Sequence, residues 1–302
     1  MKKLKLVFGL AVLIISIHSC DKIEQPLEKK NVGQPVDTTG NDTTINYTSY
    51  SDTSLTIRKL LLEEFTGHGC GNCPSAAITA NQHKQTYGDT LILVSIHASF
   101  FAAPNYPNNS YATDFRTIAG TEYNNFWDVD GAGYSQGFIS RSNIINNNII
   151  IPPASWGTAI ANMKNLLPDV KLEIGLIYNS SSRTLSTTTK TTALNQLNNA
   201  YKLIVYLIED NIIDWQQNYS LPSGQQHVSN YNHRHVLRDV INGTWGEEII
   251  PAATSAGSRH TKTYNNYVIN SNWNVSNCMI VAYLYNSTTY EIIQAEEVHI
   301  VP

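Results

Sequence analysis

The sequence predicts an α/β domain followed by an all-β sandwich domain, and three observations lead to this prediction. Apolar runs alternate with helical periods between residues 55 and 167, as they do in α/β domains. Over residues 168–302 the helical period disappears, and strand-like segments follow one another between Asn-, Ser- and Gly-rich turns. Ahead of both parts, residues 1–19 have the pattern of an export signal and residues 20–54 that of a flexible tether.

The export signal ends on a cysteine. Three lysines precede an apolar run over residues 6–17, which is too short to span a bilayer. The signal ends with Ile17-His18-Ser19-Cys20, which resembles a bacterial lipobox and implies that Cys20 is acylated and anchors the chain in a lipid bilayer. The alternative is an ordinary cleaved signal with a chance cysteine. Beyond it, residues 20–54 are polar and rich in Thr, Asn, Asp and Pro, as flexible tethers are.

Composition excludes several classes of protein. Without the three lysines of the signal, 20 basic residues become 17 against 24 acidic ones, a net charge of −7. No basic stripe is present, so nucleic acid is not an expected partner. Apolar residues make up 42% of the chain, enough to build cores, which excludes a globally disordered protein. The sequence carries no phosphate-binding loop, no G-x-S-x-G and no H-E-x-x-H, and we expect neither a cofactor nor a metal.

Each element of the α/β part has a local signal. "LLLEEF" at residues 60–65 and "TLILVSIH" at residues 90–97 are apolar runs of the kind found in buried strands. Between them, Pro74 in the first turn and Gly88 at the end delimit a helix over residues 75–87. The remaining predicted elements are a helix over 111–126, strands over 137–140 and 148–151, and a helix after Pro153 with Trp156, Ile160, Met163 and Leu167 on one face.

The second part alternates with period two. Apolar residues occupy every second position from Val170 to Tyr178, as in a half-buried strand. About six more strand-like segments follow, which predicts an immunoglobulin-like or jelly-roll-like sandwich. Cys278 lies in an apolar run, and we expect a buried, inert thiol there. The histidines at 227, 233, 235 and 260 suggest either a metal cluster or, with much more weight, a polar surface strand.

Cys70 and Cys73 stand at the junction between a predicted strand and a predicted helix, and three interpretations are open. A structural staple closing so short a loop would contribute only about 2 kcal/mol. A metal site needs two further ligands, for which His68 and His97 are candidates. In a redox centre, the helix N-terminus favours the thiolate of a partly exposed Cys70, and Cys73 resolves mixed disulfides. The order strand, C-x-x-C, helix, strand favours the redox centre.

The segment "EFTGHGCGNCP" resembles the active-site motif of the thioredoxin superfamily. The resemblance implies a thioredoxin-like fold for residues 55–167 and a disulfide between Cys70 and Cys73. It also implies catalytic roles: Cys70 as the attacking thiol, Cys73 as the resolving thiol, and Glu64 as the buried acid that exchanges a proton with Cys73.

The chain departs from the thioredoxin pattern in the loop "GYSQG". Ser135 stands where that family has a cis-proline beside the disulfide, next to Tyr134. A cis bond before a residue other than proline costs about 3 kcal/mol. We therefore expect a trans bond before Ser135, and a substrate groove at Tyr134 and Ser135 that differs from that of the family.

The wider pattern resembles the outer membrane protein 28 family of bacterial lipoproteins, in the segments "LLLEEFTGHGCGNCP", "DFRTIAGTEY", "GYSQGFISR", "HRHVLRDVINGTWGE" and "IIQAEEVHI". This resemblance implies a thioredoxin-like domain coupled to a C-terminal β domain, lipid-anchored in the cell envelope of a Gram-negative bacterium, at the outer membrane. Two functions are compatible with it. One is thiol–disulfide exchange with envelope or surface proteins. The other is a binding or scaffold lipoprotein whose β-sandwich engages a protein or glycan and whose disulfide is vestigial, so whether the chain is an enzyme is left open.

Overall fold

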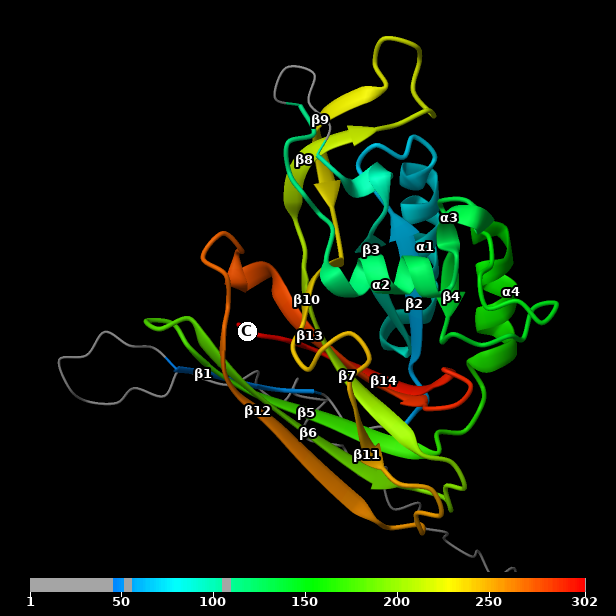
Figure 1. The fold of residues 1–302 in the computed structure, drawn as a ribbon, viewed down its shortest axis with the longest axis vertical. Coiled ribbons are helices and arrows are strands. Elements are labelled where there is room, and N and C mark those ends of the chain that lie inside the picture. Colours follow the sequence, from blue (N-terminus) through cyan, green and yellow to red (C-terminus); the bar gives the residue numbers. More distant parts are fainter. Residues whose placement is uncertain (1–45, 52–55, 105–109, 302) are drawn as a thin grey trace, which may run out of the picture. The chain divides into compact units, whose positions relative to one another are not determined.

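The fold is built mostly from strands. The computed structural model describes residues 46–51, 56–104 and 110–301 (Figure 1). The export signal, Cys20 and most of the predicted tether lie outside these residues. Within them the strands form a four-stranded sheet, a mixed eight-stranded sheet and a two-stranded hairpin, accompanied by few helices. The prediction of a β-rich fold is confirmed.

The strands, in chain order, are β1 (Asn46–Tyr50), β2 (Leu60–Thr66), β3 (Leu91–His97), β4 (Gly137–Ile139), β5 (Val170–Asn179), β6 (Thr184–Ala193), β7 (Tyr201–Glu209), β8 (Ile212–Gln217), β9 (His227–His233), β10 (Val236–Val240), β11 (Glu247–Ile250), β12 (Arg259–Val268), β13 (Cys278–Asn286) and β14 (Ile292–His299). The α-helices are α1 (Cys73–Tyr87), α2 (Ile118–Phe126), α3 (Val129–Ala132) and α4 (Pro153–Met163), with 3-10 turns at Gly88–Thr90, Phe100–Ala102 and Val275–Asn277.

Strand β2 carries the segment that leads into the cysteine pair. It pairs in parallel with β3 along its whole length, from Leu60 opposite Leu91 to Thr66 opposite His97. On its other side it pairs antiparallel with β4. Because helices and strands cover both faces, all seven residues of β2 are buried, as the continuous apolar run predicts. One face packs on α1 and α4, in a core that includes Leu62 and Trp156.

The four-stranded sheet has the order β1-β5-β6-β12 and packs against one part of the eight-stranded sheet. Alternate residues of β5 point into the core between them, in keeping with their period of two. The opposite wall of this core comes from β7, β13 and β14, with Leu203, Ile280 and Ile293 among its residues. Cys278 is a free, buried thiol at the same wall, and burial raises its pKa to about 12. The prediction of a buried cysteine is confirmed.

The eight-stranded sheet draws strands from both sides of the predicted domain boundary. Its order is β14-β13-β7-β10-β3-β2-β4, with β11 paired to β7. The junction is β10, which pairs antiparallel with β7 and in parallel with β3 through Val236 and Ser95. A single core cluster contains Phe65 of β2 together with Tyr206 of β7 and Val281 of β13. The division into domains over 55–167 and 168–302 stays a prediction, but the sheet runs across it without interruption.

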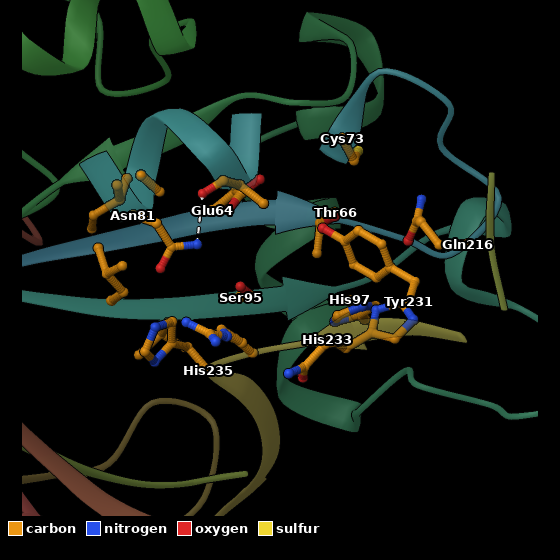
Figure 2. Close-up of a pocket in the computed structure, with 17 residues that line it drawn as sticks. Glu64, Thr66, Cys73, Asn81, Ser95, His97, Gln216, Tyr231, His233 and His235 are labelled. Carbon is orange, nitrogen blue, oxygen red and sulfur yellow. Dashed lines mark hydrogen bonds between the residues drawn. The ribbon is translucent and has the colours of Figure 1, made fainter. Parts of the chain in front are cut away.

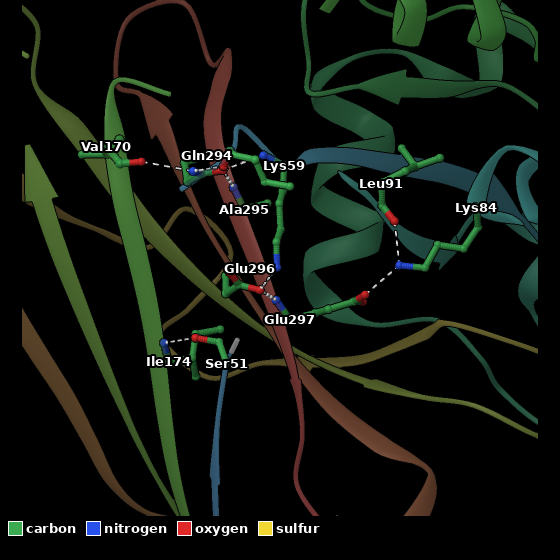
Figure 3. Close-up of polar contacts among 11 residues, drawn as sticks. Ser51, Lys59, Lys84, Leu91, Val170, Ile174, Gln294, Ala295, Glu296 and Glu297 are labelled. Carbon is green, nitrogen blue, oxygen red and sulfur yellow. Dashed lines mark hydrogen bonds and ion pairs between the residues drawn. The ribbon is translucent and has the colours of Figure 1, made fainter. Parts of the chain in front are cut away.

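Polar contacts also connect β14 to the first part of the chain (Figure 3). The Gln294 side-chain amide donates to the Ile57 and Val170 carbonyls, and its oxygen accepts from the Lys59 amide at 2.8 Å. The ammonium of Lys84, in the last turn of α1, donates to the Leu91 carbonyl and to Glu297 of β14. The polar atoms of the buried Gln294 side chain therefore all have hydrogen-bond partners, as buried polar groups usually do.

A fully buried ion pair connects four strands of the eight-stranded sheet. The Arg141 guanidinium donates to both carboxylate oxygens of Glu63, at 2.7 Å each, and both side chains are 0% exposed. The Tyr206 hydroxyl donates to the same carboxylate, and Arg141 also donates to the Tyr283 hydroxyl at 2.7 Å. The guanidinium lies over the Trp127 ring, 4.7 Å from its centroid. The Arg141 guanidinium, at the end of β4, is therefore the point at which β2, β7 and β13 meet.

Two predicted helices are shorter than expected. The helix predicted over residues 111–126 begins only at Ile118. The Thr117 side chain accepts a hydrogen bond from the Gly120 amide and caps the helix there, while Tyr111 has a left-handed φ of 57°. The last helix ends at Met163, so Leu167 does not share its apolar face and is 84% exposed.

Two other predictions about strands were wrong. Residues 148–151 make only isolated bridges, because Asn146 and Asn147 form a tight left-handed turn and Pro152 follows. The predicted tether was to reach residue 54, but residues 46–50 form β1, which pairs along its length with β5.

Candidate functional site

The cysteine pair lies between the end of β2 and the start of α1. Cys70 and Cys73 form a disulfide, with their Cα atoms 5.4 Å apart. The helix begins at Cys73 itself, with Pro74 next, where the missing N–H has no helical partner to lose. Cys70 is only 4% and Cys73 only 2% exposed. The expectation that Cys70 is partly exposed is therefore wrong, because the β8–β9 hairpin covers it.

Ser135 contacts the disulfide directly. Its hydroxyl donates to the Cys73 sulfur at 3.4 Å and lies 3.7 Å from the Cys70 sulfur. Ser135 has a φ of 71°, and every described peptide bond is trans. Tyr134 instead donates to the Asn124 side chain, which fixes the loop rather than touching the sulfurs. The structure thus brings Ser135 to the pair, and the role of both residues in a substrate groove stays a prediction.

Glu64 and Cys73 line one cavity of about 200 Å³ (Figure 2). Glu64 is 3% exposed, and its Oε1 has no hydrogen-bond partner among the described residues. Burial disfavours the charged carboxylate and raises its pKa to about 8. The direction agrees with the expectation for a buried acid. A carboxyl group that titrates near neutral pH can both give and accept a proton there.

A cluster of buried histidines borders this cavity, and the sequence analysis did not identify it. The His97 ring lies 5.5 Å from that of His233 and 4.9 Å from that of Phe115. The pKa of His97 is held well below its usual range. Burial is the main cause, and the neighbouring His233 and His68 lower the pKa further. Burial lowers the pKa of His233 to about 4. These imidazoles are therefore neutral near pH 7. The sequence contains no signal for the cluster, because its members come from separate strands and loops.

The hairpin of β8 and β9 covers the disulfide, and this too was not foreseen. At the end of β8 the chain runs along the C-x-x-C loop, and the Gln216 side chain donates to the Cys70 carbonyl at 3.0 Å. The hairpin is held by Asp214, which accepts from the Thr113 hydroxyl, and by His227, which lies 2.8 Å from the Tyr111 hydroxyl. The hairpin has polar, exposed residues, and no local pattern marks which loop it covers.

No group of three or more potential metal-ligating side chains occurs in the part of the chain that the structure describes. His233 is buried beside His97, whereas His227 contacts Tyr111, so these two histidines of the sequence pattern have separate surroundings. Among the described residues, no helix is both long and apolar enough to cross a membrane.

Comparison with known proteins gives one family and several structural neighbours. The family described as outer membrane protein Omp28 matches residues 121–302. Among solved structures, HBP35 of Porphyromonas gingivalis is similar with a TM-score of 0.53 and 15% identity, over 80% of this chain and 75% of that one. At that identity the likeness concerns the fold alone. No curated protein matches the chain.

Two further solved structures are more distant. A structural-genomics protein of Agrobacterium tumefaciens has a TM-score of 0.47 and 14% identity, over 82% of this chain and 96% of that one. A domain of the outer membrane lipoprotein Omp28 from Porphyromonas gingivalis has a TM-score of 0.29 and 22% identity, over 45% of this chain and 92% of that domain.

Proposed function

The chain belongs to the Omp28 family of outer membrane proteins, and from that premise we propose that it exchanges thiols and disulfides with other envelope proteins through Cys70 and Cys73. The observation that carries the proposal is the surroundings of the disulfide. A closed pair at a strand-to-helix junction shares a cavity with the buried Glu64 carboxyl and accepts a hydrogen bond from the Ser135 hydroxyl. A disulfide that served only as a staple would need neither group.

The proposal includes a thioredoxin-like arrangement for residues 55–167. In its support, β2, α1 and β3 form a parallel strand–helix–strand unit, and β4 adds an antiparallel strand on the far side of β2. α4 then packs on the same face as α1. The fourth strand that such a sheet would have is reduced here to the bridge between Gly137 and Ile151.

The exchange reaction transfers two electrons between the pair and a dithiol partner. A thiolate of the partner attacks the Cys70 sulfur, the Cys70–Cys73 bond breaks, and a mixed disulfide forms with Cys70. Cys73 leaves as a thiolate and takes the proton of Glu64. The second partner thiolate then attacks the partner sulfur of the mixed disulfide and releases Cys70. The partner is oxidised by two electrons and the pair is reduced by two, and the reverse sequence reduces a partner disulfide.

Glu64 is suited to both directions because burial raises its pKa to about 8. Near pH 7 it holds a proton beside the oxidised pair and can protonate Cys73 as that sulfur leaves. In the reverse direction the ionised form accepts the Cys73 proton, so that Cys73 can attack. His97 and His233, which line the same cavity, are neutral near pH 7.

A binding or scaffold protein is the second candidate, and one observation favours it. Both sulfurs are almost completely buried, at 4% and 2% exposure, whereas exchange requires a partner thiolate to reach Cys70 in line with the S–S bond. In this case the disulfide would stabilise the loop, and the β-sandwich would engage a protein or glycan partner.

Trapping of mixed disulfides separates the two candidates. The Cys73→Ser variant lacks the resolving thiol and should accumulate adducts of Cys70 with envelope proteins, visible on non-reducing gels and by mass spectrometry. Cys70→Ser is the matched control and should accumulate none. Cys278 is an internal control, because its buried thiol should resist alkylation in the folded protein. Equal absence of adducts in both variants would favour the binding protein.

The lipid anchor belongs to the same proposal. Cys20 lies outside the described residues, and its acylation is inferred from the sequence pattern. The Cys20→Ala variant should leave the membrane fraction or keep its export signal, with unchanged folding of residues 46–301. Membrane association equal to that of the wild type would contradict acylation at Cys20.

A further inference from the structure

We propose that residues 216–220, which we call the strap, are a lid that shields the disulfide and must open before a thiol reaches Cys70. The inference rests on the proposed function and adds a regulation of the same site. The strap begins at the end of β8 and leaves the hairpin before β9 starts. The strap is far from the C-x-x-C loop in the sequence, but four sets of contacts hold it against that loop.

Backbone hydrogen bonds fix the strap along the C-x-x-C loop. The Gln217 amide donates to the His68 carbonyl at 2.7 Å, and the Tyr219 amide donates to the Gly71 carbonyl at 2.8 Å. Amides two residues apart point to the same side of an extended chain. The strap therefore lies on the loop as an added strand would, and it occupies the His68 and Gly71 carbonyls, which flank Cys70 in the chain.

Two side chains close the gaps around the sulfurs. The Gln216 amide, 2% exposed, donates to the Cys70 carbonyl at 3.0 Å and to the Gly67 carbonyl at 3.3 Å. The Tyr219 ring packs directly on Gly71, where an added Cβ would lie 2.4 Å from the ring. Glycine between the cysteines thus provides the room that the tyrosine fills. With both side chains in place, little of either sulfur is left accessible.

The same contacts show how the strap can open. Tyr219 is 53% exposed, so only one face of its ring is buried, and the bond between the Ser75 and Ser220 hydroxyls lies at the surface. The last paired residues of the hairpin are Gln217 and His227, and the Asn218 amide donates to the Gln226 carbonyl at 2.7 Å, so Tyr219 and Ser220 at the end of the strap can move away while β8 and β9 stay paired. Such local opening breaks a few hydrogen bonds and leaves the cores intact.

The rate at which dithiothreitol reduces the disulfide tests the proposal. If the strap must open first, the observed rate is the intrinsic rate multiplied by the open fraction. Tyr219→Ala removes the ring over Gly71 and should raise the reduction rate about tenfold, measured by quenching with an alkylating reagent and mass spectrometry. Ile213→Ala is the matched control: Ile213 is 61% exposed on β8, in the same hairpin but outside the strap. It should react as the wild type does.

Hydrogen exchange on the wild-type protein gives a second measurement that requires no variant. The amides of Gln217 and Tyr219 should be protected in the oxidised protein. Equal reduction rates for Tyr219→Ala, Ile213→Ala and wild type would overturn the strap, and so would unprotected amides at 217 and 219. Neither result depends on a cellular partner. Faster reduction of Tyr219→Ala would support the strap even if Cys73→Ser formed no adducts. The absence of adducts would then refute only the exchange function, so the two failures are distinguishable.

Discussion

Glu63 and Glu64 are neighbours on β2, both buried, with opposite surroundings. Successive side chains of a strand point to opposite faces, so Glu63 meets Arg141 and the Tyr206 hydroxyl while Glu64 lines the cavity that it shares with Cys73. The sequence shows two acids in an apolar run, which already indicates that each needs a special environment. The resemblance to the thioredoxin motif points to Glu64, but the sequence provides no means of choosing Arg141 as the partner of Glu63.

The pKa of Glu64 makes stability depend on pH. The folded-state pKa of about 8 lies above the ordinary value of about 4.3, so the folded protein binds this proton more tightly than the unfolded chain. The stability that the proton contributes is fully present below about pH 4 and is lost as the pH rises to about 8. We expect Glu64→Gln to match the wild type at pH 5 and to exceed it by about 3 to 5 kcal/mol at pH 9.

Urea unfolding of the oxidised protein between pH 5 and pH 9 measures this difference. Glu248→Gln is the control, since Glu248 is an exposed carboxylate on β11, and its profile should follow the wild type. Parallel profiles for Glu64→Gln and wild type would mean that Glu64 is ionised in the fold and does not hold a proton near neutral pH.

At the level of elements, the local patterns predict what a strand or helix is but not always where it ends. Period-two alternation found β5, and Pro74 and Gly88 delimit a helix that matches α1 within two residues. The shortened α2 depends on the cap at Thr117, and the helical period continues through that residue. The covering of the disulfide by the β8–β9 hairpin depends on backbone hydrogen bonds, which leave no trace in the sequence.

The Glu63–Arg141 pair holds several elements together, and breaking it should cost more than the pair contributes. Arg141→Met leaves a buried carboxylate without its cation, and we expect a loss of about 3 to 5 kcal/mol in the free energy of unfolding. The double variant Glu63→Gln/Arg141→Met removes both charges and should recover most of that loss, since the side-chain amide oxygen introduced on β2 can still accept from Tyr206. Urea denaturation of the three proteins measures both steps. A double variant no more stable than Arg141→Met would contradict this account.

For the whole molecule, the sequence predicts two successive parts, but it contains no signal for the sheet that joins them. The patterns that mark strands are local, whereas the pairing of β10 with β3 joins residues about 140 positions apart, at Val236 and Ser95. The sequence pattern of a strand buried on both faces is the same whether the neighbouring strand comes from the same domain or from the next one. The mixed eight-stranded sheet therefore becomes visible only in the structure.

Because the sheet and the core around Phe65, Tyr206 and Val281 are shared, we expect residues 46–301 to unfold in one transition. A fragment that ends at residue 167 would expose one face of β2 and β3 and should show no cooperative transition. Circular dichroism and tryptophan fluorescence during urea unfolding measure both. Two separated transitions in the longer protein, or a cooperative transition in the fragment, would instead support independent domains.

The position of the strap in the chain sets an order of events during export. Cys70 and Cys73 are three residues apart and can meet as soon as α1 begins to form, whereas the strap lies about 145 residues later and must wait for most of the chain to cross the membrane. During that interval the two thiols face the oxidising compartment with nothing over them. The pair is thus open to oxidation early in the life of each molecule, and it is enclosed only when residues 216–220 arrive.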